Sequence, residues 1–253
     1  MSDDGDRQHG HAGGPEPRVF IKTLGVFESW VDHTEAIWKG CGAGAGQLKR
    51  ALALLIARRD QPVRREVVLE VAGGYALKGA RNVIPGLRKM LHSWGIEIAL
   101  TLNKLSITLH RHALWQTDGD RIDRQFALAH AAMGAGDAGG ALASLDGVED
   151  LCGGLYLPIY DSPPEYAIDD MVDYWQQRQK ETLQLLARVR VATGDPRQHA
   201  PAMRAAARAL RFDRENPASY LFAAQIARQC GNEERARSYE RLAPRYRAGP
   251  APG

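Results

Sequence analysis

The sequence has few cysteines, no long apolar run and no hydrophobic leader, and each shortage excludes a class of protein. The three cysteines of this 253-residue chain, Cys41, Cys152 and Cys230, are far apart, which argues against a disulfide framework or a zinc knuckle. The longest apolar stretch, residues 51–57, is much shorter than the roughly 18–20 residues of a membrane span. The first residues are acidic and polar, unlike a secretory signal. We therefore expect a cytoplasmic protein without a membrane partner.

Signatures of nucleotide and metal binding are also missing. The glycine-rich run 40–46 precedes a basic helix, but its spacing fits neither the dinucleotide-binding fingerprint nor the P-loop. It predicts a connector. His110 and His112 alternate along the chain, yet no third ligand follows at a metal-binding spacing. We expect no metal and no cofactor.

Acidic residues give no catalytic pattern either. Asp118, Asp120 and Asp123 lack the order of a calcium loop, and we expect them to cap a helix that begins near Ile122. The adjacent acid pairs 149–150 and 169–170 point in different directions. Because no Ser-His-Asp or Cys-His spacing is recognisable, we expect no enzyme activity.

Charge is distributed unevenly along the chain. The formal net charge is only +3, but residues 45–112 hold twelve Lys/Arg against four Asp/Glu. Residues 113–175 hold two against twelve, and residues 176–253 hold fifteen against seven. A basic segment that suits a polyanion is thus followed by an acidic one that does not.

The basic segment lies in a region whose pattern mixes strands and helices. Residues 19–30 are rich in β-branched and aromatic side chains and predict two short strands, with a third through Ile37–Trp38. Apolar spacing predicts helices over 48–56, 63–71 and 80–91. Residues 96–102 and 105–109 flank Asn103–Lys104, which indicates a hairpin. Strands, three helices and a hairpin are the order of a winged helix, whose third helix enters the major groove.

The remainder of the chain is helical in pattern between polar tails. We expect disorder in residues 1–17 and 245–253, a winged helix in 18–112 and a helical domain in 113–244. Helices are predicted over 124–134, 139–145, 166–193, 198–210, 218–230 and 233–242. The pairs Gly194–Asp195 and Gly231–Asn232 separate successive helices at 37 residues, near the ~34-residue period of tetratricopeptide repeats.

With these features the chain resembles the bacterial transcriptional activator domain family, which joins an OmpR/PhoB-type winged helix to an all-α domain, as in activators of antibiotic biosynthesis. The resemblance implies an α+β N-terminal winged helix-turn-helix followed by an all-α tetratricopeptide-like helical domain. It implies double-stranded DNA as a partner, and RNA polymerase, another regulator or a second copy of the chain as further partners. It is carried by residues 21–28 (IKTLGVFE), 47–70, 86–91 (GLRKML), 102–109 (LNKLSITL), 114–126 and 153–179.

One position departs from the family. Its recognition helix is normally unbroken, whereas Pro85–Gly86 falls inside the third predicted helix here. Proline costs about 3 kcal/mol in a helix interior and is tolerated in the first turn. Either the helix begins near Ile84, which leaves about two and a half turns, or it is bent.

The candidate DNA contacts are polar residues of the winged helix. Arg and Asn side chains recognise guanine and adenine edges, and Lys suits phosphates. The alternative is a solvated basic face. The candidates are Arg64, Arg65, Lys78, Arg81, Asn82, Arg88, Lys89, His92 and Lys104.

The helical half holds weaker candidates. Tyr156, Tyr160 and Trp175, in or near a proline-rich loop, either line a groove for a ligand or partner, or fix the loop to the core. One face of an alanine-rich helix is either simply solvated or binds an acidic partner or a small anionic effector. Its residues are Arg204, Arg208 and Arg211.

Three functions follow from the sequence. The first is a DNA-binding transcriptional regulator whose helical domain oligomerises or senses an effector. The second is a protein-interaction adaptor with a degenerate winged helix that no longer binds DNA. The third is an anion or nucleotide sensor that acts through the arginine-rich helical face.

Overall fold

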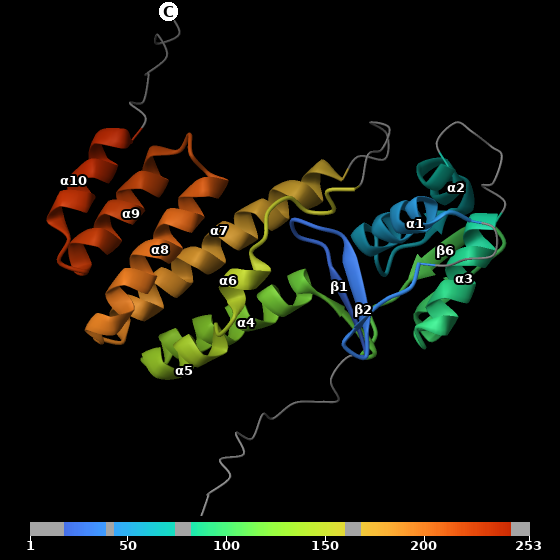
Figure 1. Ribbon diagram of the computed structural model, residues 1–253, viewed down its shortest axis with the longest axis horizontal. Coiled ribbons are helices and arrows are strands. Elements are labelled where there is room, and N and C mark those ends of the chain that lie inside the picture. Colours follow the sequence, from blue (N-terminus) through green and yellow to red (C-terminus); the bar gives the residue numbers. More distant parts are fainter. Residues whose placement is uncertain (1–17, 39–42, 74–81, 160–167, 244–253) are drawn as a thin grey trace, which may run out of the picture.

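The computed structural model describes residues 18–38, 43–73, 82–159 and 168–243. The molecule is elongated, with α3 near one end and α10 at the other (Figure 1). The first strands form a sheet of order β3-β2-β1-β7, in which β1 is antiparallel to β2 and parallel to β7. Its strands are β1 (Val19–Lys22), β2 (Glu28–Val31), β3 (Thr34–Glu35) and β7 (Trp115–Thr117).

Three helices and a second sheet complete the N-terminal half. The helices are α1 (Ala45–Ala57), α2 (Arg65–Gly73) and α3 (Val83–Ser93). The second sheet has the order β4-β6-β5, with strands β4 (Val63–Arg64), β5 (Leu100–Leu102) and β6 (Ser106–Leu109). Leu52, Leu87 and Ile107 are fully buried and belong to one core. The predicted order of strands, three helices and hairpin is therefore confirmed.

The short strands differ from the sequence prediction. Val63, expected in a helix, pairs with Ile107 in β4, and the helix α2 begins two residues later, at Arg65. Residues 97–99 form a 3-10 turn rather than the first half of a strand. The third strand is Thr34–Glu35 rather than Ile37–Trp38, since Asp32 and His33 have φ values of 47° and 66° and turn the chain early.

Pro85 does not break α3. The helix begins at Val83, so the proline is its third residue and lies in the first turn, where the backbone N–H has no intrahelical partner. Of the two alternatives, the helix that starts near Ile84 is correct. Gly86 is buried beside it, and α3 continues for 11 residues in all.

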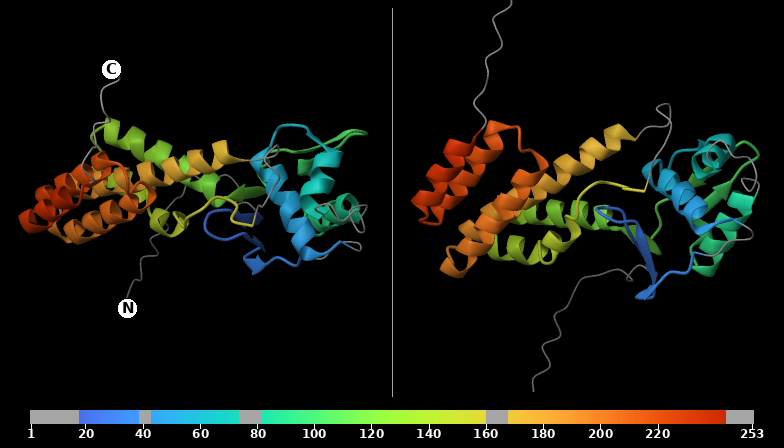
Figure 2. Two further views of the ribbon diagram at one scale, coloured as in Figure 1. Left: turned by 90° about the horizontal axis from the view of Figure 1, so that it is seen from above. Right: turned by 45° about the horizontal axis from the view of Figure 1, so that its top comes forward.

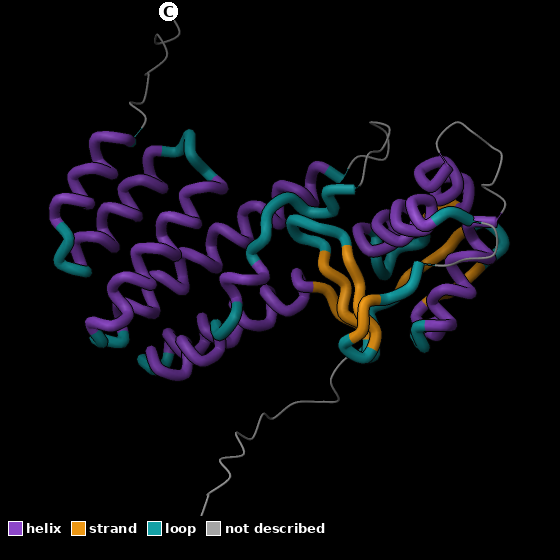
Figure 3. The backbone as a smooth tube through the Cα atoms, viewed as in Figure 1, coloured by secondary structure: helices purple, strands orange, loops and turns teal. Residues whose placement is uncertain are grey.

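The second half is built from helices that lie side by side (Figures 1 and 3). Contacts link α4 with α5 and α7, α7 with α8, and α9 with α8 and α10. Whether this stack is tetratricopeptide-like stays a prediction. No described helix is long and apolar enough to cross a membrane. The elements are α4 (Asp118–Gly134), α5 (Ala138–Ser144), α6 (Val148–Leu151), α7 (Asp169–Ala192), α8 (His199–Ala209), α9 (Pro217–Gln229) and α10 (Glu233–Leu242).

Three of the turns between these helices repeat one device: those after α7 and α9, and Gly136–Asp137 between α4 and α5. Gly194 and Gly231 follow the C-terminal caps of α7 and α9 with φ values of 68° and 74°, a left-handed conformation that glycine adopts without strain. The next residue accepts a hydrogen bond from a backbone N–H: Asp195 from Arg197, and Asn232 from Arg235. The glycine–Asx pairs seen in the sequence therefore end one helix and cap the next helical turn.

Candidate nucleic-acid interface

Helix α3 presents a polar face to solvent. Asn82, Pro85, Arg88, Lys89 and His92 are exposed, and their spacing of three and four residues places them on one side of the helix. The opposite side is buried in the core and consists of Val83, Ile84, Leu87, Met90 and Leu91. Helix α3 itself lies far from the C-terminal helices in both views of Figure 2.

Glu97 neutralises part of this face. Its carboxylate lies 2.6 Å from Arg88 Nε and 2.6 Å from His92 Nδ1. The hydrogen bond from Arg88, followed by that from His92, lowers the pKa of Glu97. Lys89 has no ion-pair partner among the described residues and is the free cation of the face.

The turn of the β5–β6 hairpin is the second exposed element. Lys104 is exposed at its tip, and the neighbouring Leu105 side chain is 77% exposed. The Arg65 backbone N–H donates to Leu105 O at 3.0 Å, and its guanidinium donates to Asn103 O at 3.3 Å. Arg64 lies 3.6 Å from Glu66. Lys78 and Arg81 lie outside the described residues.

Other cations of the basic segment have structural roles. Arg50 donates to the carbonyls of Val71 and Ala72 at the C-terminal end of α2, where a positive charge suits the helix dipole. Lys49 lies 5.2 Å above the ring of Trp38. The net charge of +8 in residues 45–112 therefore overstates the positive charge that is free to contact a polyanion.

Two further arginines pair with the acidic segment. At the end of α1, Arg59 lies 2.5 Å from Asp120 and is only 12% exposed, while Arg58 lies 3.9 Å from Asp170 at the start of α7. Opposite charges thus meet across the contact between the two halves. The charge contrast in the sequence partly reflects this internal junction.

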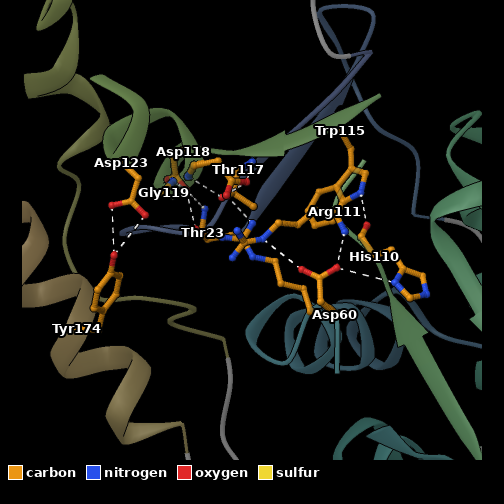
Figure 4. A network of polar contacts seen from close by, with 12 residues as sticks. Thr23, Asp60, His110, Arg111, Trp115, Thr117, Asp118, Gly119, Asp123 and Tyr174 are labelled. Carbon is orange, nitrogen blue, oxygen red and sulfur yellow. Dashed lines mark hydrogen bonds and ion pairs between the residues drawn. The ribbon is translucent and has the colours of Figure 1, made fainter. Parts of the chain in front are cut away.

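Asp118 is the centre of the junction (Figure 4). Its buried carboxylate accepts hydrogen bonds from the backbone N–H groups of Thr23 (2.9 Å), Leu24 (2.9 Å) and Gly119 (3.0 Å), and from the Thr23 hydroxyl (2.5 Å). Burial raises the pKa of Asp118, against the opposing effect of these donors. This carboxylate joins the end of β1 to the start of α4.

Of the three aspartates expected to cap this helix, only Asp120 takes part in the cap, and the helix starts earlier than predicted. Thr117 is the N-cap of α4 and forms a reciprocal capping box with Asp120. Asp123 instead contacts Arg178 at 2.9 Å and the Tyr174 hydroxyl at 3.3 Å, as Figure 4 shows for Tyr174.

The two histidines after β6 serve different contacts. His110 Nε2 lies 3.1 Å from the Thr101 hydroxyl, and Nδ1 lies 3.8 Å from Asp60. His112 Nδ1 accepts the backbone N–H of Leu114. Within the described residues, no group of three potential ligands could hold a metal ion.

Tyr156 and Trp175 fix the loop before α7 to the core. They are 6% and 2% exposed, with ring centroids 5.8 Å apart. Trp175 covers the first turn of α4, where a Cβ on Gly119 would lie 2.5 Å from the indole. The structure thus places Trp175 in the core rather than on a partner surface. Tyr160 lies outside the described residues.

Gly119→Ala should lower the free energy of unfolding by about 2 kcal/mol, because the methyl group overpacks against the buried Trp175. Gly134→Ala, at the other end of the same helix, is the matched control because a Cβ there meets nothing within 4 Å. Urea unfolding of both variants checks this. Equal stabilities of the two variants would contradict the packing argument.

The three arginines near α8 do not act as one surface. Arg208 donates to the carbonyl oxygens of Glu149 (2.6 Å) and Cys152 (3.2 Å). Arg204 and Arg211 are exposed, and only Arg208 and Arg211 line the cleft beside the loop that contains Tyr156. The sequence identified these residues, but the cleft depends on a loop that is distant in sequence.

Comparison with known proteins identifies the fold. No family model matches the chain, and no curated protein matches its sequence. A solved structure of Mycobacterium tuberculosis EmbR, in complex with a low-affinity phosphopeptide, is similar with a TM-score of 0.68 over 90% of this chain, at 15% sequence identity. The chain spans 59% of that EmbR chain.

Proposed function

We propose that the chain is a DNA-binding transcriptional regulator of the bacterial transcriptional activator domain family. In this proposal residues 18–112 form the winged helix, and the following helices form the tetratricopeptide-like domain. The observation that carries it is the exposed polar face of α3, a helix that lies away from the C-terminal helices. The fold shared with EmbR supports the same architecture.

In this function α3 enters the major groove and the β5–β6 hairpin is the wing. An 11-residue helix is about 16 Å long, comparable to the roughly 12 Å width of the groove. Asn82 and Arg88 are the residue types that bind base edges, whereas Lys89 and Lys104 suit phosphates. Lys89 and Lys104 contribute affinity through phosphate contacts. Arg88 must break its ion pair with Glu97 before it can bind a base.

The helical half has a separate assignment. We assign to it oligomerisation or contact with a second protein, such as RNA polymerase or another regulator. The proposal includes no catalytic step, metal or cofactor, and places the protein in the cytoplasm. The adaptor alternative is supported by Glu97, whose carboxylate pairs with two of the groups that would face DNA, Arg88 and His92.

Salt dependence of DNA binding by the full chain tests the proposal. Fluorescence anisotropy with a labelled duplex should give an observed affinity that falls with salt on a log–log plot with a slope of about −3. Lys89, Lys104 and Arg64 would each release about one counterion from a phosphate. No binding at 50 mM salt would refute the regulator and favour the adaptor.

Glu97→Gln should raise the affinity for duplex DNA about threefold to tenfold. The change removes a negative charge from the α3 face and frees Arg88 and His92 for phosphates or bases. Glu28→Gln, at an exposed position of β2, makes the same change in net charge away from α3. An equal gain in both variants would show that the effect is not local.

A further inference from the structure

A cleft of about 380 Å³ lies in the helical half, within the size range of small-molecule sites. One wall is the loop 153–156, a second is the first part of α7, and a third is the end of α8 with the 3-10 turn Leu210–Phe212. It is distinct from the α3 face.

The cleft has an excess of positive charge. Arg208 and Arg211 line it, and Arg211 has no hydrogen-bond or ion-pair partner among the described residues. The carboxylate of Glu149 is held by Arg190 at 2.8 Å and lies 3.9 Å from Arg208. Arg208 uses Nη2 to bond the carbonyl oxygens of Glu149 and Cys152, so it offers an anion only its remaining N–H groups, whereas the whole guanidinium of Arg211 is available.

The rest of the lining is largely apolar. Leu155, Val172 and Phe212 line it, together with the buried Tyr156. Burial raises the pKa of the Cys152 thiol to about 12, so this thiol lines the cleft in its neutral form. An apolar wall beside two guanidinium groups suits a ligand with an apolar body and one anionic group.

The loop wall is bonded to the N-terminal sheet. Gly25 N–H donates to Leu155 O at 2.8 Å, and Leu157 N–H donates to Thr23 O at 2.7 Å. A Cβ on Gly25 would lie 2.6 Å from Gly153 O, so the two backbones are in direct contact. On the other side, the buried Gln179 amide bonds both the N–H and the carbonyl of Gly154.

We propose that this cleft binds a small organic anion, an apolar body that bears a carboxylate or a phosphate. Arg211 and Arg208 hold the anionic group, and Leu155, Val172 and Phe212 contact the body. Binding shifts the loop 153–156 and, through its bonds to residues 23–25, changes the DNA affinity of the winged helix. This last step rests on the proposed function, whereas the binding itself does not.

Titration calorimetry of the full chain without DNA tests the site. The probes are 1-naphthoate, phenyl phosphate, inorganic phosphate and the neutral 1-naphthamide. We expect one site per chain for 1-naphthoate or phenyl phosphate, with a Kd below 1 mM as an order-of-magnitude expectation. The amide lacks the negative charge and inorganic phosphate lacks the apolar body, so each should bind at least about tenfold more weakly. Whichever of the two aryl anions binds more tightly identifies the anionic group.

Variants separate the cleft from a general charge effect. Arg211→Gln should weaken binding about tenfold through loss of a charged hydrogen bond. Arg204→Gln, an exposed arginine of α8 outside the cleft, should leave it unchanged. Val172→Phe, which fills the space without removing charge, should also weaken it.

Three results would overturn the site: no aryl anion binds at millimolar concentration, the amide binds equally well, or Arg211→Gln matches the wild type. The coupling is tested separately, by DNA titration of the ligand-saturated chain, where we expect an affinity change of at least fivefold. An unchanged affinity would refute the coupling alone. Ligand binding by a chain that never binds DNA would refute the proposed function and leave the site in place.

Discussion

A chain with Lys89→Glu and Lys104→Glu should bind duplex DNA about a hundredfold more weakly than the wild type at 100 mM salt. The two substitutions change the charge of the α3 face and hairpin tip by four units and replace two phosphate contacts with repulsion. Both lysines are exposed, so the variant should fold normally. Anisotropy titration with the duplex used for the wild type measures the loss of affinity. The magnitude of the salt slope should decrease by about two.

The matched control reverses two cations elsewhere. Arg204 and Arg214 are exposed in the helical half, and Arg204→Glu with Arg214→Glu makes the same change in net charge. If DNA binding depends on the α3 face, this control should keep its affinity within about threefold. A comparable loss in both variants would mean that net charge, and not the winged helix, governs the affinity.

Asp118→Ala should lower the free energy of unfolding by about 4 kcal/mol. The substitution leaves the buried N–H groups of Thr23 and Leu24 without an acceptor, and each such loss costs about 1–3 kcal/mol. Asp146→Ala, at an exposed loop position, is the control and should change stability by less than about 0.5 kcal/mol. Urea unfolding measures both variants. An equally small effect of Asp118→Ala would contradict the role of this carboxylate in the junction.

The same residue predicts a dependence on pH. Burial raises the pKa of Asp118 above its ordinary value of 3.8. Its contribution to stability is therefore fully present below that value and declines as the pH rises through the folded-state pKa. The stability difference between wild type and Asp118→Ala should accordingly be larger at pH 3.5 than at pH 6. A stability difference that grows with pH would show that folding lowers the pKa of Asp118 instead of raising it.

The helices were predictable from sequence because their buried apolar residues recur with the helical period over many residues. In α1 the buried leucines at 48, 52 and 55 repeat with the helical period. The strands β4 and β7 have two and three residues, too few to show alternation. β7 also pairs with β1, a partner nearly a hundred residues away, which no local pattern reveals.

The candidate interface was only partly predictable, because sequence gives residue types but not their partners. The pattern identified Arg88, Lys89 and His92 as candidate DNA contacts, and all three are exposed. It did not reveal that Glu97 would reach two of them from a 3-10 turn. Arg59 adds to the basic charge of the sequence, but in the fold it pairs with Asp120 and is not part of the interface.

The parallel pairing of β1 with β7 limits how the protein can be shortened. A fragment that stops before Trp115 would bare one side of β1 and lose the Asp118 acceptor for Thr23. An uncovered strand of this kind recruits neighbouring chains and promotes aggregation. The smallest fragment suited to expression therefore runs through β7 into α4, so that it contains the N-terminal half together with the first helix of the second half.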